Sequence, residues 1–164
     1  MAELTNLESK LGEVLGLAMA AQTATQNVQK LEGLPSELEE RLVQMHDEAK
    51  ETEERATDVA GAFDGKKTAI LDEARDVKKK ASEMMSAYLE SASDALDGFE
   101  FLTMAEAGEV GHWEILKTLN ERARNAPLQD LCEWAIPIQQ RHFEEVRSGS
   151  LQLAADEDTE ESAE

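Results

Sequence analysis

The chain has 164 residues and a formal net charge of −20. A charge of this sign repels phosphate backbones and anionic lipid, which argues against nucleic acid and membrane as partners. Aromatic residues make up only 4% of the chain, alanine, leucine and glutamate are abundant, and no run alternates β-branched with polar residues. These features predict an all-α fold. The single cysteine, Cys132, allows no internal disulfide and fits a reducing cytoplasm, which is the predicted location.

The first predicted helix begins at Thr5 and ends before Gly33. Thr5 and Glu8 have the spacing of a capping box, and glycine commonly ends a helix. The apolar stripe of this helix comprises Leu7, Leu11, Val14, Leu15, Ala18, Ala21, Thr25 and Val28.

The second and third predicted helices differ in the quality of their apolar stripes. The second begins with Ser36 as its cap and Glu39 as the capping partner, and ends at Asp64 and Gly65. Its stripe comprises Leu38, Leu42, Met45, Ala49, Thr52, Ala56, Val59 and Phe63. The third helix has a poorer stripe of Ile70, Ala74, Val77, Ala81, Met84 and Tyr88, and three lysines at 78–80. We therefore expect the third helix to lie outside the main bundle as a crossover element.

The fourth predicted helix covers residues 95–124, and the fifth begins at Pro127. The expected inward stripe of the fourth comprises Phe99, Leu102, Ala105, His112, Ile115, Leu116 and Leu119. That of the fifth comprises Leu128, Leu131, Ala135, Ile138, His142 and Val146, and Pro137 is expected to kink it. Residues 154–164 hold six acids and no base, so we predict a bundle domain over 1–153 and a disordered acidic tail over 154–164. The tail would serve as a solubilising segment or as the docking site of a protein partner.

All three histidines lie on or beside predicted inward stripes, and each is on a different helix. Glu109 precedes His112 by three residues, so the two side chains would share one face of the helix. Gln139 precedes His142 by the same spacing, and Glu53 follows His46 by two helical turns. We therefore expect a polar cluster near the middle of the bundle. Hydrogen bonds or a metal ion could satisfy such buried groups, and the residues alone leave both alternatives open.

Residues 109–123, EVGHWEILKTLNERA, resemble the third bundle helix of the ferritin-like stress proteins of the YciE/YciF type, where the pattern is v-E-H-Y-E-I-a. Residues 11–15, 46–56 and 138–146 are similar to the other three bundle helices, but less specifically. The resemblance implies an antiparallel four-helix bundle with a crossover helix between bundle helices 2 and 3. It also implies a centre for iron or manganese, and the candidate metal ligands are Glu53, Glu109, His112, His142 and His46.

The chain departs from the pattern of this family at several ligand positions. Gly111 stands where the family has glutamate, and Gln139 and Gln140 stand where it has a glutamate pair. A di-iron centre draws its negative charge from several carboxylates, so we expect a degenerate site. If the site holds no metal, we expect Glu109 to hydrogen-bond a histidine, because an unpaired buried carboxylate is costly.

Three functions are compatible with these observations. The first, which the loss of carboxylates favours, is a non-enzymatic, stress-associated ferritin-like bundle, and we expect it to form a homodimer. The second is an iron or manganese protein with peroxide, oxygen or storage chemistry. The third is an unrelated acidic helical scaffold or adaptor. No residue stands out as catalytic.

Overall fold

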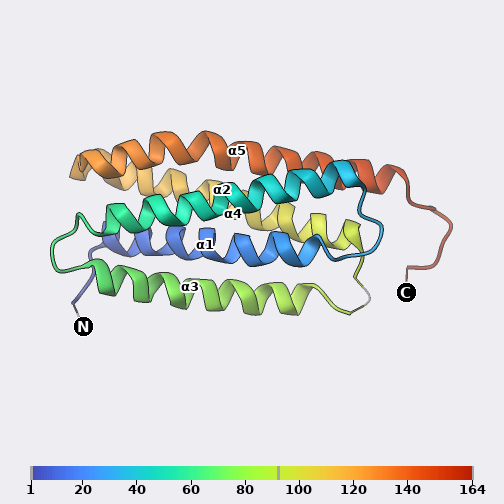
Figure 1. Ribbon diagram of the computed structural model, residues 1–164, viewed down its shortest axis with the longest axis horizontal. Helices are drawn as coiled ribbons and strands as arrows, with labels where there is room; N and C mark the ends of the chain where they lie inside the picture. Colours follow the sequence, from blue (N-terminus) through green and yellow to red (C-terminus); the bar gives the residue numbers. More distant parts are fainter. Residues whose placement is uncertain (1, 92, 164) are drawn as a thin grey trace.

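The computed structural model describes residues 2–91 and 93–163, and over these ranges the chain forms five helices and no strand (Figure 1). The helices are α1 (Asn6–Val28), α2 (Ser36–Ala60), α3 (Lys67–Tyr88), α4 (Ala95–Ala123) and α5 (Ala126–Ala155). The all-α prediction is therefore confirmed. None of these helices is long and apolar enough to cross a membrane.

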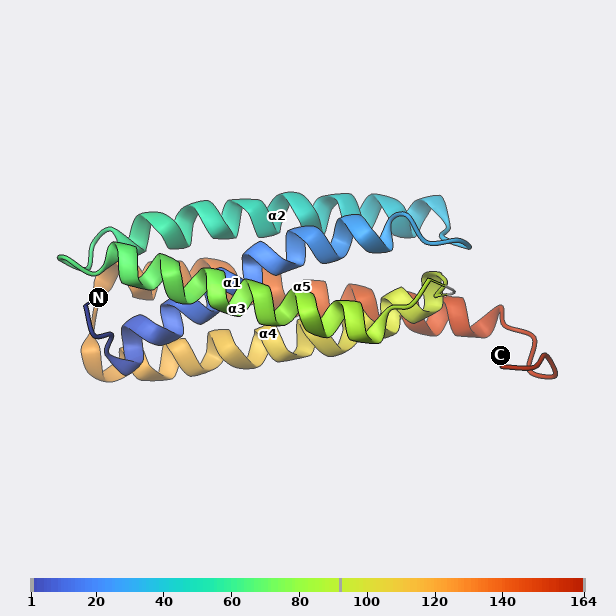
Figure 2. The ribbon, with the colours of Figure 1, turned by 90° about the horizontal axis from the view of Figure 1, so that it is seen from below.

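Consecutive helices run in opposite directions along the long axis of the molecule (Figure 1). Four of them form a closed ring of contacts, in which α1 packs on α2, α2 on α5, α5 on α4, and α4 on α1. α3 lies outside this ring along α1 and has a smaller contact with α2 (Figure 2). The chain therefore traverses the length of the molecule in α3 before it re-enters the ring as α4.

The core consists of two apolar clusters at opposite ends of the helices. One cluster surrounds Trp113 and takes residues from the start of α1 and α5 and the end of α2. The other surrounds Phe99 and takes residues from the end of α1 and α5 and the start of α2. No residue belongs to both clusters, and the helix segments between them carry the polar side chains described below.

α1 and α3 approach closely because α1 presents glycine to its neighbour. A Cβ atom built on Gly16 would lie 2.4 Å from the carbonyl oxygen of Ala74 and 2.8 Å from Cβ of Val77. Only a glycine allows the two backbones this separation. Only a few residues of α3 are buried. Met84 and Tyr88 were predicted to face inward, but they are exposed.

Helix ends follow the predicted caps in most places. The capping box of Thr5 and Glu8 is present, but Ser36 is the first residue of α2 and makes no capping hydrogen bond, because Pro35 occupies the cap position. α5 is helical on both sides of Pro137 and continues to Ala155, slightly beyond the predicted end of the bundle domain.

The predicted inward stripe of α4 is confirmed at Phe99, Leu102 and Leu116. The buried face of the second half of the helix is nevertheless rotated slightly from the predicted one. From Leu102 onwards, the buried positions of the helix are Leu102, Glu106, Glu109, Trp113, Leu116 and Asn120. Ile115 is 48% exposed, although it was predicted to face inward. Three of the six buried positions are polar, so the apolar residues alone point to a neighbouring face of the helix. This rotation places two glutamates, rather than a histidine, in the interior.

Candidate functional site

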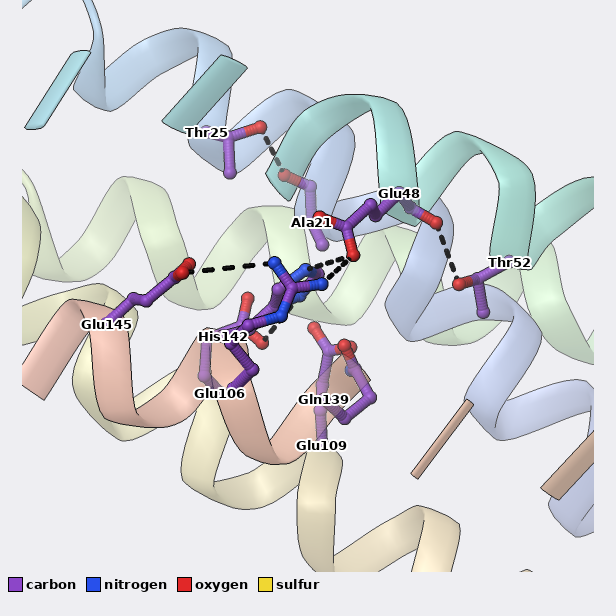
Figure 3. Close-up of polar contacts among 10 residues, drawn as sticks. Ala21, Thr25, Glu48, Thr52, Glu106, Glu109, Gln139, His142 and Glu145 are labelled. Carbon is purple, nitrogen blue, oxygen red and sulfur yellow. Dashed lines mark hydrogen bonds and ion pairs between the residues drawn. The ribbon is translucent and has the colours of Figure 1, made fainter. Parts of the chain in front are cut away.

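Five polar side chains from three helices meet halfway along the bundle, between the two apolar clusters. They are Glu48 of α2, Glu106 and Glu109 of α4, and Gln139 and His142 of α5 (Figure 3). We call this group the polar centre. The four members on α4 and α5 are between 1% and 5% exposed, and the Glu48 side chain is 16% exposed.

Glu106 and Glu109 lie three residues apart, so both project from the same face of α4. Gln139 donates a hydrogen bond to Oε2 of Glu109, whereas Oε2 of Glu106 is buried with no hydrogen-bond partner. Burial raises the pKa of Glu106 to about 8. Burial and the neighbouring charge of Glu106 also raise the pKa of Glu109. Glu106 is therefore mostly protonated at neutral pH, and the same burial favours the neutral form of Glu109.

His142 lies between the carboxyl groups of α2 and α4. Its Nε2 atom is 3.7 Å from Oε2 of Glu48, and its Nδ1 atom is 3.8 Å from Oε2 of Glu106. Both distances exceed those of a hydrogen bond, and Nε2 has no partner among the residues that the structure describes. Burial lowers the pKa of His142 to about 4, so the imidazole is neutral at physiological pH.

Arg141 brings a permanent positive charge to the edge of the polar centre. Its guanidinium group donates a hydrogen bond to Oε2 of Glu48 and is 3.8 Å from Oε1 of Glu145. The bond to Glu48 raises the pKa of Arg141 above its usual value. Glu48 is therefore the member of the polar centre whose negative charge is balanced within the chain.

Glu109 and His142 are the two predicted metal ligands that the structure brings to the polar centre. Glu109 accepts a hydrogen bond across the interior from α5, but the donor is the amide of Gln139 and not a histidine. The expected glutamate–histidine hydrogen bond is therefore wrong. The reason is that Gln139 lies one turn before His142 and faces Glu109 directly.

The other three predicted ligands lie elsewhere. His46 contacts the carbonyl oxygen of Gln22 at 3.0 Å, and Gln22 donates to Glu53, so these two residues satisfy an α1–α2 contact. His112 has a 40% exposed side chain, and its Nδ1 atom lies 3.2 Å from Glu13 of α1. The predicted pairing of Glu109 with His112 at a metal is thus not favoured by the directions of their side chains.

Sequence reasoning missed Glu106 and Arg141. Glu106 could have been found from the spacing of Leu102, Glu106, Glu109 and Trp113, which follows one helical face. Glutamate is rarely fully buried, which makes a glutamate on an inward face difficult to recognise from the sequence.

Over residues 2–91 and 93–163, no group of three or more histidine, cysteine, aspartate or glutamate side chains has a geometry that could hold a metal ion. Comparison of the chain with protein-family models, with curated proteins and with solved structures finds no match. The residues of the polar centre do not fit a pair of iron ions. Ala21 and Thr25 of α1 lie beside it (Figure 3), α5 supplies an amide and an imidazole, and the guanidinium group of Arg141 already pairs with Glu48.

Proposed function

We propose that this chain is a ferritin-like bundle protein with a degenerate di-metal centre and a non-enzymatic, stress-associated role. Two features support the proposal. The first is the closed ring of α1, α2, α5 and α4 with α3 as the crossover between its halves. The second is the position of the polar centre, halfway along the ring where ferritin-like bundles build their metal sites.

The observation that carries the proposal is the contact of Arg141 with Glu48. Di-iron bundles take glutamates from all four helices, and the negative charge of these groups balances the metal ions. Here a guanidinium group supplies positive charge inside the chain. A metal ion would have to compete with this charge and would also have to displace the proton of Glu106. Such a centre favours hydrogen bonding over dioxygen chemistry.

Metal titration tests this proposal directly. The purified chain is incubated without oxygen with excess iron(II) or manganese(II), desalted, and analysed for bound metal and for its melting temperature. We expect much less than one ion per chain and an unchanged melting temperature. Two ions per chain, with a rise in melting temperature that His142→Ala abolishes and the exposed His112→Ala retains, would overturn the proposal.

The stress association rests on the resemblance of residues 109–123 and has its own test. Deletion of the gene from the source cells is expected to reduce survival of peroxide or osmotic challenge, and a variant with Glu106→Gln should restore survival fully. Restoration by the wild type alone would indicate that the carboxyl group of Glu106 performs chemistry.

A second candidate function is the binding of one iron or manganese ion, for storage or peroxide chemistry. Three buried atoms without partners favour it, namely Oε1 of Glu48, Oε2 of Glu106 and Nε2 of His142. Carboxylate and imidazole groups are ligands that both metals accept. In the titration above, this alternative predicts one ion per chain, and its loss in both Glu106→Gln and His142→Ala.

A further inference from the structure

Arg141 lies among side chains of the types that bind metal ions. Its guanidinium group donates a hydrogen bond to Oε2 of Glu48 and is 3.8 Å from Oε1 of Glu145. The same Oε2 atom of Glu48 is 3.7 Å from Nε2 of His142. His142 and Glu145 are three residues apart on α5 and therefore share one face of this helix (Figure 3). The guanidinium group is thus held between two carboxyl groups, one of which also faces an imidazole.

Each of these three side chains keeps one buried atom without a partner among the described residues. The atoms are Oε1 of Glu48, Oε2 of Glu145 and Nε2 of His142. The side chain of His142 is only 2% exposed, so bulk solvent does not reach its nitrogen. Carboxylate oxygens and imidazole nitrogens are ligands that manganese, iron and zinc accept. The unpartnered atoms are therefore of the kind that a divalent cation binds.

The spacing and orientation of Glu48 and His142 suit a single ion. Two atoms that bind one ion at roughly 2.2 Å in tetrahedral geometry lie about 3.6 Å apart. The observed separation of Oε2 of Glu48 and Nε2 of His142 is 3.7 Å. On the other side of the ring, Nδ1 is 3.8 Å from Glu106. Metal-binding histidines commonly direct their second nitrogen to a carboxyl group, which fixes the orientation of the ring. His142 therefore has the orientation of a ligand.

The guanidinium group opposes an ion at this position in two ways. It bonds to the Glu48 oxygen that an ion would need, and its charge repels a second cation at short range. An arginine keeps this charge at every physiological pH. Arg41, whose charge also acts on Glu145, is paired with Glu37 at 2.9 Å. Arg141 is therefore the positive charge that an ion would have to replace.

We propose that Arg141 excludes metal ions from the polar centre, and that its removal turns Glu48, Glu145 and His142 into a site for one divalent cation. The guanidinium group then serves as an internal substitute for the ion. This inference rests on the proposed function, a degenerate metal centre. It goes further because it assigns the exclusion to one residue, names the ligands that this residue blocks, and predicts a gain of binding.

The first test removes the guanidinium group. Manganese(II) binding is measured by electron paramagnetic resonance, in enough salt to screen the acidic surface. We expect Arg141→Ala to bind one ion per chain at least about tenfold more tightly than the wild type. Arg147→Ala is the matched control, because Arg147 also pairs with a glutamate of α5 but is exposed, and it should behave as the wild type. Equal affinity of Arg141→Ala and Arg147→Ala would overturn the proposal.

Two further variants separate the charge of Arg141 from its packing. Arg141→Lys and Arg141→Gln both keep most of the length of the side chain, so both should fold even if alanine loosens the contact between α2 and α5. The lysine variant keeps the positive charge and should exclude manganese(II), whereas the glutamine variant should bind it. Equal binding by the two variants would show that charge does not exclude the ion and would refute the proposal.

The ligands are tested in the Arg141→Gln chain. Addition of His142→Ala should abolish binding and should remove the signal of a coordinated nitrogen from the pulsed electron paramagnetic resonance spectrum. Addition of His112→Ala should preserve both, because the side chain of His112 is 40% exposed and faces Glu13. A nitrogen signal that persists without His142 would place the ion at another site and would contradict the assignment.

The wild type distinguishes failure of this inference from failure of the proposed function. If neither the wild type nor the variants without the charge bind manganese(II), Arg141 is not the determinant, and the inference fails while the degenerate centre stands. If the wild type already binds one ion as tightly as Arg141→Gln does, the proposed function fails together with the inference.

Discussion

The two ends of the bundle and its middle solve different physical problems. At each end, the four helices of the ring interlock large apolar side chains, with Trp113 in one cluster and Phe99 in the other, each no more than 1% exposed. In the middle, α2, α4 and α5 bring together carboxyl, imidazole and amide groups, four of which are no more than 5% exposed. Three of these groups, on Glu48, Glu106 and His142, keep a buried atom without a partner.

The ends and the middle of the bundle therefore contribute to stability with opposite signs. Burial of apolar surface stabilises the ends, whereas buried polar atoms without partners cost free energy. A chain selected for stability alone would have leucine or alanine in the middle as well. The apolar ends therefore have to offset the cost of the polar centre.

The largest expected effect concerns the first apolar end. Trp113→Ala removes the largest fully buried side chain and should lower the free energy of unfolding by about 3–5 kcal/mol. Urea denaturation measures this change. The exposed Lys79→Ala should change it by less than about 0.5 kcal/mol, and equal losses for the two variants would contradict the assignment of Trp113 to the core.

The second prediction concerns the polar centre, where a substitution should stabilise the fold. Glu106→Gln should increase the free energy of unfolding at pH 8 by an amount on the order of 2–3 kcal/mol, because the amide avoids the cost of ionising a buried carboxyl group. The exposed Glu100→Gln on the same helix is the matched control and should have little effect. Destabilisation by Glu106→Gln would mean that the acid itself holds the centre together.

The same residue determines how stability depends on pH. The pKa of Glu106 rises from 4.5 to about 8 on folding, so the folded chain holds a proton that the unfolded chain has lost, and stability falls as the pH rises in this range. The pKa of His142 falls from 6.5 to about 4, so the contribution of His142 to stability falls as the pH drops below 6.5 and opposes that of Glu106. Between pH 6.5 and 8 the carboxyl effect acts without that of His142. Urea denaturation at pH 6.5 and at pH 8 measures this effect. The free energy of unfolding of the wild type should be lower at pH 8 than at pH 6.5, and the difference should be smaller in Glu106→Gln.

The fourth prediction concerns the second apolar end. A Cβ atom at Gly149 would lie 2.5 Å from Cε1 of Phe99, so Gly149→Ala should overpack this cluster and cost about 1–3 kcal/mol. Gly108→Ala, where a Cβ meets open space, should instead be neutral or stabilising by up to about 1 kcal/mol, because alanine favours the helix. Thermal denaturation of both variants distinguishes the two glycines, and equal shifts would contradict the close packing of α5 on Phe99.

The smallest effect is expected at the C-terminus. Deletion of residues 154–164 should change the free energy of unfolding by less than about 0.5 kcal/mol, because residues 154–163 are exposed. A deletion that begins one residue earlier also removes Leu153, which is buried in the second apolar cluster, and should cost measurably more. Equal stability of the two truncated chains would show that the end of α5 contributes nothing to this cluster.

The sequence by itself determined the helices and most of their inward faces. Thr5 with Glu8 marks the start of α1, and the stripe predicted for α1 is buried almost throughout. These features are local, since a cap or an i, i+3, i+4 pattern needs only neighbours along one helix. The peripheral position expected for α3 also followed from its weak stripe and agrees with its packing along α1.

Only the tertiary structure decided which polar side chains meet. Glu106 is buried because α5 places His142 and Gln139 opposite it, and His112 is turned toward Glu13 because α4 is rotated by one step from its apolar pattern. Arg141 reaches Glu48 across two helices that are far apart in sequence. The rotation of a helix about its own axis depends on the summed packing of all its neighbours. The sequence of α4 alone cannot reveal that rotation, because Glu106 and Glu109 interrupt its apolar pattern on the buried face.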